Sequence, residues 1–233
     1  VINCAAFTDV DGCQEQEERA TGVNGVGAGN VAAGGAGGGV LLVGMCSDYV
    51  FDGAKGSPYV ESDAVGPLSA YGRSKLAGED AVRAAAPEHH LIVRSSWLFG
   101  AGGRNFVTTI AGLAAERDEL SVVTDQVGCP TFTAHLARGL ISCAEMGLRG
   151  TAHLAGGGRC SWNEFAQEIV KGTGSSCRVL PSTTAEMARP APRPAFSAIV
   201  SERDDLPSLP PWSEGLEEFL AATGKAPTAV EAQ

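Results

Sequence analysis

The sequence predicts an α/β protein with a doubly wound parallel sheet and a smaller second domain. Apolar runs alternate with helix-forming segments along most of the chain. One of these runs, VLLVGMCSDYVF at residues 40–51, is continuous, as in a strand that is covered on both faces. Strands that alternate with helices form a parallel sheet, whose ligands bind at the carboxyl ends of the strands.

The elements of the first half follow from local patterns. VINCAAF, at residues 1–7, predicts a buried strand, and residues 11–24 predict a polar helix. Glycine crowds residues 25–40, and because each glycine costs a helix about 0.5–1 kcal/mol relative to alanine, we expect a weakened crossover helix there. The strand of residues 40–51 then leads into a long loop rich in Gly, Pro and Ser.

The second half continues the alternation and then loses it. Helices are expected at residues 71–86, 105–117, 134–146, 161–174 and 212–224, and strands at residues 90–100, 119–131 and 150–156. Prolines recur between Pro181 and Pro211, which argues against long regular elements there. Residues 225–233 are expected to form a disordered tail.

The composition excludes several classes of protein. The chain has 233 residues, of which 44% are apolar and 19% charged, as in a globular protein with one sizeable domain or one domain and a small satellite. No apolar run is long enough to span a membrane, and the formal net charge of -10 argues against a nucleic-acid or anionic-membrane surface. The seven cysteines lack Cys-x-x-Cys spacing, which favours free thiols in a reducing cytoplasm over disulfides or zinc.

A tyrosine and a lysine stand one helical turn apart in the segment SAYGRSKLAGED. Tyr71 precedes Lys75, and a helix would place both side chains on one face. Alone, such a pair is more often ordinary surface chemistry than a site. Ser47, however, precedes them at the expected carboxyl end of a strand, where the ligands of a parallel sheet bind. A hydroxyl, a phenol and an amine are therefore expected at one edge of the sheet.

Six longer segments around these residues carry a resemblance to one family. NCAAFTDVD, SDYVFDGAKGSPYVESD, GPLSAYGRSKLAGE, VRSSWLFG, LSVVTDQVGCPT and RPAFS occur in this order. Together they resemble the dTDP-4-dehydrorhamnose reductases and related dTDP-4-keto-6-deoxysugar reductases, in the extended branch of the short-chain dehydrogenase/reductase superfamily. The resemblance implies a Rossmann-like fold, NADPH or NADH as the cofactor, and a dTDP-sugar as the substrate.

The resemblance also implies a division of the chain into domains. Residues 1–98 and about 124–160 would form the remainder of the NAD(P)-binding domain. Residues from about 99 to 123, together with 161–224, would form the domain for the nucleotide sugar. A homodimer and a cytoplasmic location are expected as well.

The family's opening strand and Gly-x-x-Gly-x-x-Gly turn do not precede Val1. In the family that turn receives the cofactor pyrophosphate at a helix N-terminus. We therefore expect an N-terminally truncated fragment of a longer protein, or else a degenerate copy. On this expectation the 233-residue chain alone would bind NADPH poorly and would aggregate through an unpaired strand edge.

By the same resemblance, Ser47, Tyr71 and Lys75 are the catalytic residues. Tyr71 would donate a proton to the ketone oxygen, Ser47 would hydrogen-bond that oxygen, and Lys75 would hold the nicotinamide ribose. Lys75 and the positive charge of the oxidised nicotinamide would also lower the pKa of Tyr71 from its usual value near 10. The family usually has Thr where Ser47 stands, and Ser keeps the hydroxyl.

Other residues acquire implied roles. The substrate would be bound by Asp48, Trp97 and Asn105, and the cofactor by Ala6, Phe7, Thr8, Met45, Tyr71 and Lys75. A polar link beneath the nicotinamide is expected from Asn24, and a contact near the diphosphate from Arg193. Three alternatives stay open: Asp48 as a turn residue, Trp97 as a core indole at the domain seam, and Asn24 as a helix cap. No metal is expected, because PTFTAH lacks the acidic residue that some family members link to magnesium.

Other functions on this fold also stay open. A nucleotide-sugar 4,6-dehydratase needs an Asp-Glu pair after the strand-end hydroxyl, and Tyr49 stands where that glutamate would be. The alternatives are a nucleotide-sugar epimerase and a non-catalytic binding subunit, like the reductase-related regulatory subunit of methionine adenosyltransferase. The joint presence of Ser47, Tyr71 and Lys75 favours a reductase.

Overall fold

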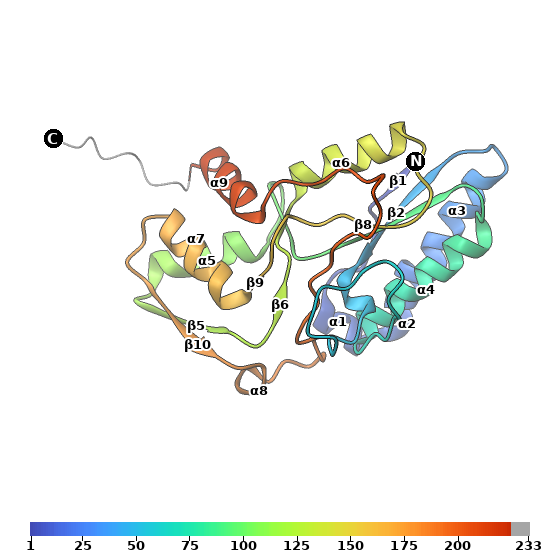
Figure 1. Ribbon diagram of the computed structural model, residues 1–233. Coiled ribbons are helices and arrows are strands. Elements are labelled where there is room, and N and C mark those ends of the chain that lie inside the picture. The colour runs from blue at the N-terminus through green and yellow to red at the C-terminus, as the bar shows by residue number, and fades with distance from the viewer. Residues whose placement is uncertain (225–233) are drawn as a thin grey trace.

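The computed structural model describes residues 1–224, so the tail expected at residues 225–233 lies outside the described residues. Its central sheet has four parallel strands in the order β1-β2-β3-β8 (Figure 1). The strands are β1 (Ile2–Asn3), β2 (Leu42–Ser47), β3 (His90–Ser95) and β8 (Gly150–His153). The predicted parallel α/β sheet is therefore confirmed.

Helices cover both faces of this sheet. α3 (Ala28–Ala36) and α4 (Ala70–Ala85) lie along one face, and α6 (Thr133–Glu145) lies along the other (Figure 1). Successive strand residues point to opposite faces, so that Leu42, Cys46 and Ile92 share a core with α3 and α4, while Val43, Leu91 and Val93 pack with α6. The continuous apolar pattern of β2 and β3 follows from this double burial.

The glycine-rich segment is helical, and glycines on both sides of its contact with α4 allow a close approach. α1 (Val10–Glu15) and α2 (Glu17–Ala20) lead into a π-helical stretch, η1 (Thr21–Gly27), which continues as α3. A Cβ on Gly29 would lie 2.9 Å from the Ala81 Cβ of α4, and one on Gly78 would lie 2.2 Å from the Asn24 carbonyl oxygen. Glycine therefore lets these helices approach α4 closely, although it lowers their intrinsic helix propensity.

A second core lies beside the sheet. It is built from α5 (Phe106–Glu116), α7 (Trp162–Gly172) and α9 (Trp212–Ala222), with β5 (Glu119–Val123) paired in parallel with β10 (Arg178–Ser182). Its centre contains Phe99, Phe165 and Phe219, all almost fully buried. The domain boundaries stay a prediction, but the two faces of the sheet and this second core have separate sets of buried residues.

Several predicted strands are shorter than expected. Only Ile2–Asn3 of residues 1–7 is a strand, and residues 90–100 divide into β3 and β4 (Leu98–Phe99). Residues 119–131 divide into β5, β6 (Val127–Gly128) and the start of β7 (Thr131–Phe132). β4 pairs with β7, and β6 pairs with β9 (Cys160–Ser161). Each break turns the chain at the edge of the sheet, which a run of apolar residues does not reveal.

β10 was not expected, because Pro181 lies inside it. The strand pairs with β5 alone, so it is an edge strand, and proline is tolerated in edge strands because the outer N–H groups have no partner. A short helix, α8 (Thr184–Met187), follows it. Both elements are short, in agreement with the prediction that the recurring prolines between residues 181 and 211 exclude long regular elements.

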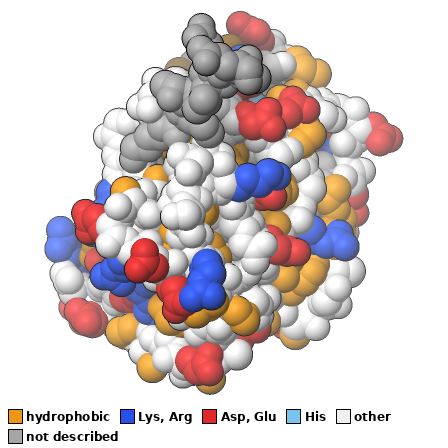
Figure 2. All heavy atoms as spheres, turned by 90° about the vertical axis from the view of Figure 1, so that its left-hand side faces the viewer, with side chains coloured by type: hydrophobic (Ala, Val, Ile, Leu, Met, Phe, Trp, Pro, Cys, Tyr) orange, Lys and Arg blue, Asp and Glu red, His pale blue; other side chains and the backbone are white. Residues whose placement is uncertain are grey.

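The surface shows no single dominant charge on the face drawn in Figure 2, where basic and acidic side chains are interspersed. Among residues 1–224, no helix is both long and apolar enough to cross a membrane.

Candidate active site

The hydroxyl of Ser47 lies at the carboxyl end of β2, at the start of a short 3-10 helix, η2 (Asp48–Val50). Its Oγ accepts a hydrogen bond from the Tyr49 backbone N–H at 3.1 Å and donates to Asp48 Oδ1 at 3.0 Å. Ser47 is 7% exposed. It is thus a helix cap and a buried hydroxyl at the strand edge where the sequence predicts the site.

Tyr71 is held in the first turn of α4. Ser69 caps this helix by accepting from the Gly72 N–H at 3.1 Å. A Cβ on Gly72 would lie 2.2 Å from the Tyr49 carbonyl oxygen, so glycine is needed for the helix to begin against η2. The Tyr71 ring meets the Tyr49 ring edge-on, with 5.8 Å between centroids. The phenol is therefore placed beside the end of β2 by backbone packing.

The protonation of Tyr71 is governed by burial. Burial raises the pKa of the phenol above its ordinary value, and nearby Cys46 raises it further, while the Ser47 hydroxyl opposes the rise. The expected lowering depends on Lys75 together with the positive charge of a bound oxidised nicotinamide, so it stays a prediction. The phenol is consequently protonated at neutral pH, which is the form a proton donor needs.

Lys75 is 7% exposed and lies one turn along α4 from Tyr71. Its Nζ donates to the Met45 carbonyl oxygen of β2 at 2.7 Å. Lys75 and Met45 line a small cavity at the edge of β2, together with Asn3, Ala5, Asn24, Ala28, Gly44, Cys46, Gly78, Glu79, Val82 and Ile92. An ammonium carries three hydrogens, so two remain for other acceptors after the bond to Met45.

A buried ion pair fixes α4 against the sheet. Glu79, one turn beyond Lys75, accepts two hydrogen bonds from Arg94 of β3, both at 2.8 Å. Arg83 adds a third at 2.6 Å. The guanidinium groups hold the pKa of Glu79 below its ordinary value despite burial, which raises it. A paired carboxylate of this kind would cost several kcal/mol to break, so it holds the helix of Tyr71 and Lys75 in register with β3.

Asn24 is a buried polar link rather than a helix cap. Its side chain accepts from the Phe7 N–H at 2.7 Å and donates to the Phe7 carbonyl oxygen at 3.0 Å and to Ser74 Oγ at 2.9 Å. Ala6 and Phe7 are half-buried and Thr8 is exposed. Asn24 and Lys75 line the same small cavity, whereas Ala6, Phe7 and Thr8 do not, so their contacts with a cofactor stay predictions.

Asp48 is buried among three serine hydroxyls. It is 2% exposed, and its carboxylate accepts hydrogen bonds from the hydroxyls of Ser47, Ser96 and Ser197. Burial raises its pKa to about 6, although the three serine hydroxyls lower it in part. Direct contact with substrate stays a prediction, whereas the serine contacts are present in the structure.

Trp97 lies between β3 and β4, and its backbone is left-handed, with a φ of 48°. Its ring stacks on Trp162 with 3.4 Å between centroids and 3° between planes, and a Cβ on Gly128 would lie 2.3 Å from the indole. It packs against the second core while staying half-buried. A non-glycine residue in this backbone region is uncommon and is found mostly where the surroundings enforce it. Both readings of Trp97, core indole and sugar contact, are compatible with this position.

A cavity of about 330 Å³ opens beside α5. Phe106, Ile110 and Trp162 supply apolar walls, and Arg189 and Arg193 supply positive charge. The Arg193 guanidinium donates to both carboxylate oxygens of Asp11, at 3.0 and 2.9 Å.

Asn105 does not line this cavity, although its neighbour Phe106 does. Its side chain accepts from the Thr108 N–H at 3.0 Å as the N-cap of α5, and its amide donates to the Gly100 carbonyl oxygen at 2.8 Å. The side chain of Asn105 therefore has a structural role as a helix cap, and its contact with the diphosphate stays a prediction.

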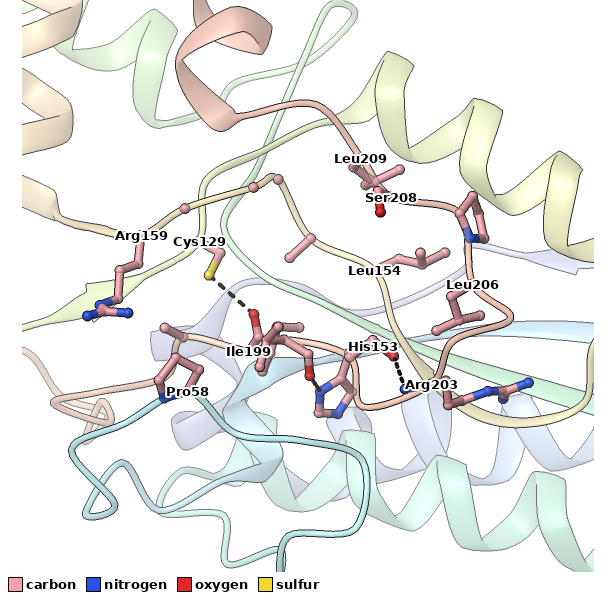
Figure 3. A pocket seen from close by; sticks show the side chains of 18 residues that line it. Pro58, Cys129, His153, Leu154, Arg159, Ile199, Arg203, Leu206, Ser208 and Leu209 are labelled. Carbon is pink, nitrogen blue, oxygen red and sulfur yellow. Dashed lines mark hydrogen bonds between the residues drawn. The ribbon is translucent and has the colours of Figure 1, made fainter.

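Another cavity, of about 350 Å³, lies at the carboxyl end of β8 (Figure 3). Cys129 Sγ lies 3.6 Å from the Ile199 carbonyl oxygen, and His153 Nδ1 lies 3.0 Å from the Val200 carbonyl oxygen. Because its partner is a carbonyl, Nδ1 carries the hydrogen, and burial lowers the pKa of His153. The polar groups that face this cavity are thus largely satisfied by the protein itself.

Local sequence patterns missed two groups at the site. Ser96 and Ser197 reach Asp48 from distant parts of the chain, and Trp162 reaches Trp97 from α7. The one signal available in the sequence was the pair of adjacent serines, Ser95 and Ser96, at the end of β3. Within residues 1–224, no group of three or more His, Cys, Asp and Glu is arranged to hold a metal ion.

Comparison with known proteins identifies the family. The RmlD substrate binding domain matches residues 1–224. A dTDP-4-dehydrorhamnose reductase from Mycobacterium tuberculosis is 41% identical over 95% of this chain and 76% of that protein. The crystal structure of a dTDP-4-dehydrorhamnose reductase from Clostridium acetobutylicum is 43% identical, with a TM-score of 0.93 over 96% of this chain and 80% of that one. Another such enzyme, from Bacillus anthracis and in complex with NADP, is 39% identical, with a TM-score of 0.92 over 95% and 79%. The chain belongs to the dTDP-4-dehydrorhamnose reductase family.

Proposed function

We propose that this protein reduces the C4 ketone of a dTDP-4-keto-6-deoxyhexose with NADPH or NADH, and that Tyr71 donates the proton. The observation that carries the proposal is the convergence of three groups on the end of β2. Ser47 ends that strand, Lys75 is bonded to its Met45 carbonyl, and Tyr71 lies one helical turn before Lys75, with its ring against Tyr49 of η2. Membership of the reductase family and the relative that binds NADP support the same reaction.

The chain's own residues account for the proton. When bound, the reduced nicotinamide supplies a hydride, which adds to the carbonyl carbon and leaves negative charge on the oxygen. The raised pKa keeps the Tyr71 phenol protonated at neutral pH, so it can give its proton to that oxygen. Lys75, with two uncommitted ammonium hydrogens, stabilises the phenolate that remains and can hold ribose hydroxyls. The products are an alcohol and the oxidised cofactor.

The cavity beside α5 suits the nucleotide part of the substrate. Its aromatic and aliphatic walls offer a surface for a base, and the guanidinium of Arg193 offers positive charge for a diphosphate. Asp11 already holds that guanidinium in place. An anionic ligand at this position would share Arg193 with Asp11, so the arginine is pre-oriented before binding.

A dehydratase is disfavoured by the state of Tyr49. Burial and the neighbouring Asp48 raise the pKa of this phenol above its ordinary value, so it is a poor acid or base at neutral pH. It cannot replace the glutamate that dehydration of the sugar requires.

Trp97→Ala tests whether the indole contacts the sugar. We expect a higher KM for the sugar nucleotide and an unchanged Kd for NADPH, because loss of apolar contact with a sugar face costs about 1–3 kcal/mol. Steady-state kinetics and calorimetric titration measure the two constants.

The matched control is Trp212→Ala, which removes a half-buried tryptophan from the same core where it packs edge-on against Phe165. It should lower the melting temperature and leave the KM unchanged. If Trp97→Ala only lowers the melting temperature in the same way, Trp97 is a core residue.

Isotope transfer tests the reaction itself. With NADPH deuterated at the transferred position of nicotinamide C4, the label should appear at C4 of the sugar in one equivalent per turnover, by NMR. A sugar that changes configuration without acquiring label would indicate an epimerase. A homodimer, a cytoplasmic location and the identity of the remaining site residues stay predictions.

A further inference from the structure

Asp48 joins three segments that lie far apart in the sequence. Ser47 Oγ at the end of β2 donates to Oδ1 at 3.0 Å. Ser96 Oγ after β3 and Ser197 Oγ near the C-terminus both donate to Oδ2, at 3.0 and 2.5 Å. All four side chains are at most 7% exposed. An isolated buried carboxylate is costly, and three charge-assisted hydrogen bonds offset much of that cost.

The two distant serines are themselves firmly held. The Ser197 backbone N–H donates to the Val127 carbonyl oxygen at 2.8 Å, and the following residue accepts from the Tyr59 N–H at 2.8 Å. Ser96 Oγ also accepts from the Cys129 N–H at 3.2 Å. Ser96 and Ser197, which are both held by backbone hydrogen bonds, therefore fix the position of Asp48 independently of Ser47.

This arrangement determines which way the Ser47 hydroxyl points. A hydroxyl has one hydrogen, and that of Ser47 is directed at Asp48. The Oγ lone pairs are left to accept, and one of them accepts from the Tyr49 N–H. The result is a short directional chain from the Ser47 hydroxyl to the Asp48 carboxylate.

We propose that Asp48 is a positioning residue of the active site: its carboxylate, clamped by Ser96 and Ser197, fixes the orientation of the Ser47 hydroxyl at the end of β2, beside the helix that carries Tyr71. The proposal rests on the proposed reductase function. It differs from a direct sugar contact, because the carboxylate acts on the catalytic groups through Ser47. Asp48 moves no proton in this role.

Protonation of Asp48 would reverse the direction of this chain. A neutral carboxyl carries a hydrogen that it can donate to a serine, which frees the Ser47 hydrogen to turn away. The titratable groups that face Asp48 are Tyr49 on η2, Tyr71 on α4 and Cys129 beyond β6. Burial raises the pKa of all three, so they stay neutral below pH 8, and Asp48, with a pKa of about 6, is the group among them that titrates in the acid range.

The first test is Asp48→Asn, with Asp80→Asn as the matched control because the Asp80 side chain is 70% exposed on the same helix as Tyr71. We expect kcat to fall about 10- to 100-fold in Asp48→Asn, as for a misaligned catalytic group, with the Kd for NADPH unchanged. Asp80→Asn should leave both constants at the wild-type value.

Thermal unfolding separates positioning from a structural role. The folded-state pKa of Asp48 is raised above its ordinary value of 3.8, so the stability linked to its protonation is complete below pH 3.8 and is lost as the pH rises through 6. A neutral amide retains that stability. The melting temperature of Asp48→Asn should therefore rise relative to wild type as the pH increases from 4 to 7, while kcat is reduced. If the carboxylate were purely structural, its replacement would lower both the melting temperature and kcat.

Ser197→Ala is the second variant. It removes a hydrogen bond that lowers the pKa of Asp48, so the acid limb of the kcat–pH profile should move to higher pH. The proposal is overturned if Asp48→Asn folds and keeps kcat within threefold of wild type. It is also overturned if Ser197→Ala leaves the acid limb of the kcat–pH profile in place. This second criterion can be applied even if Asp48→Asn fails to fold. Absence of reductase activity in the wild type would instead overturn the proposed function, and the pH dependence of unfolding would still be measurable.

Discussion

Tyr71→Phe should lose most of the turnover while the affinity for NADPH changes little. The substitution removes the phenol oxygen and keeps the ring, which meets Tyr49 edge-on, so the packing at the start of α4 survives. General acid catalysis is worth about 10²- to 10⁴-fold, and we expect kcat to fall within that range. Pre-steady-state hydride transfer, followed by NADPH fluorescence, measures the step directly.

Tyr59→Phe is the control for this change. The Tyr59 hydroxyl donates to Asp52 Oδ1 at 2.6 Å, and its ring stacks on Phe51. Its removal should cost about 0.5–1.5 kcal/mol of stability through the lost hydrogen bond and leave kcat unchanged. A Tyr71→Phe enzyme that turns over within threefold of wild type would show that another group supplies the proton.

Lys75→Met should impair binding and catalysis together. The methionine fills a similar volume in the buried site but removes the ammonium, which leaves the Met45 carbonyl oxygen without its donor and the Tyr71 phenolate without a nearby positive charge. We expect kcat to fall roughly 10²-fold or more and the Kd for NADPH to rise about tenfold. Steady-state kinetics at several NADPH concentrations separates the two effects.

Lys171→Met serves as its control, because the Lys171 side chain is 76% exposed and, within residues 1–224, pairs only with Glu168 of its own helix. It should match the wild type in both constants. Were Lys75→Met to change the melting temperature alone, Lys75 would be a structural residue that ties α4 to β2.

The local patterns of the sequence account for the fold class and for the edge of the sheet where the site lies. The continuous apolar run of β2 predicts a strand buried on both faces, and one helical turn between Tyr71 and Lys75 predicts that they share a face. Both features depend on residues that are near one another in the chain, so periodicity reveals them.

Features that depend on distant residues could not be predicted in this way. The left-handed backbone of Trp97 is imposed by packing over Gly128 and Trp162, and β10 forms at Pro181 because β5 offers it an edge. The raised pKa of Tyr71 likewise reflects burial by the whole site, which the spacing between Tyr71 and Lys75 does not reveal.

The three serines around Asp48 show the same limit. SDYVF suggests a turn aspartate or a sugar ligand, since nothing near it in the sequence points to Ser96 or Ser197. Only the meeting of β2, β3 and the C-terminal segment reveals a buried carboxylate with three hydroxyl partners.

The most direct test of the central claim is substrate-dependent oxidation of NADPH. The purified full-length protein is mixed with NADPH, a dTDP-4-keto-6-deoxyhexose is added, and absorbance of the reduced nicotinamide is followed, with Tyr71→Phe as the parallel sample. The account predicts stoichiometric loss of NADPH only when the keto sugar is present, at a rate that Tyr71→Phe lowers at least 10²-fold. A wild-type protein that binds both ligands but consumes no NADPH would contradict it.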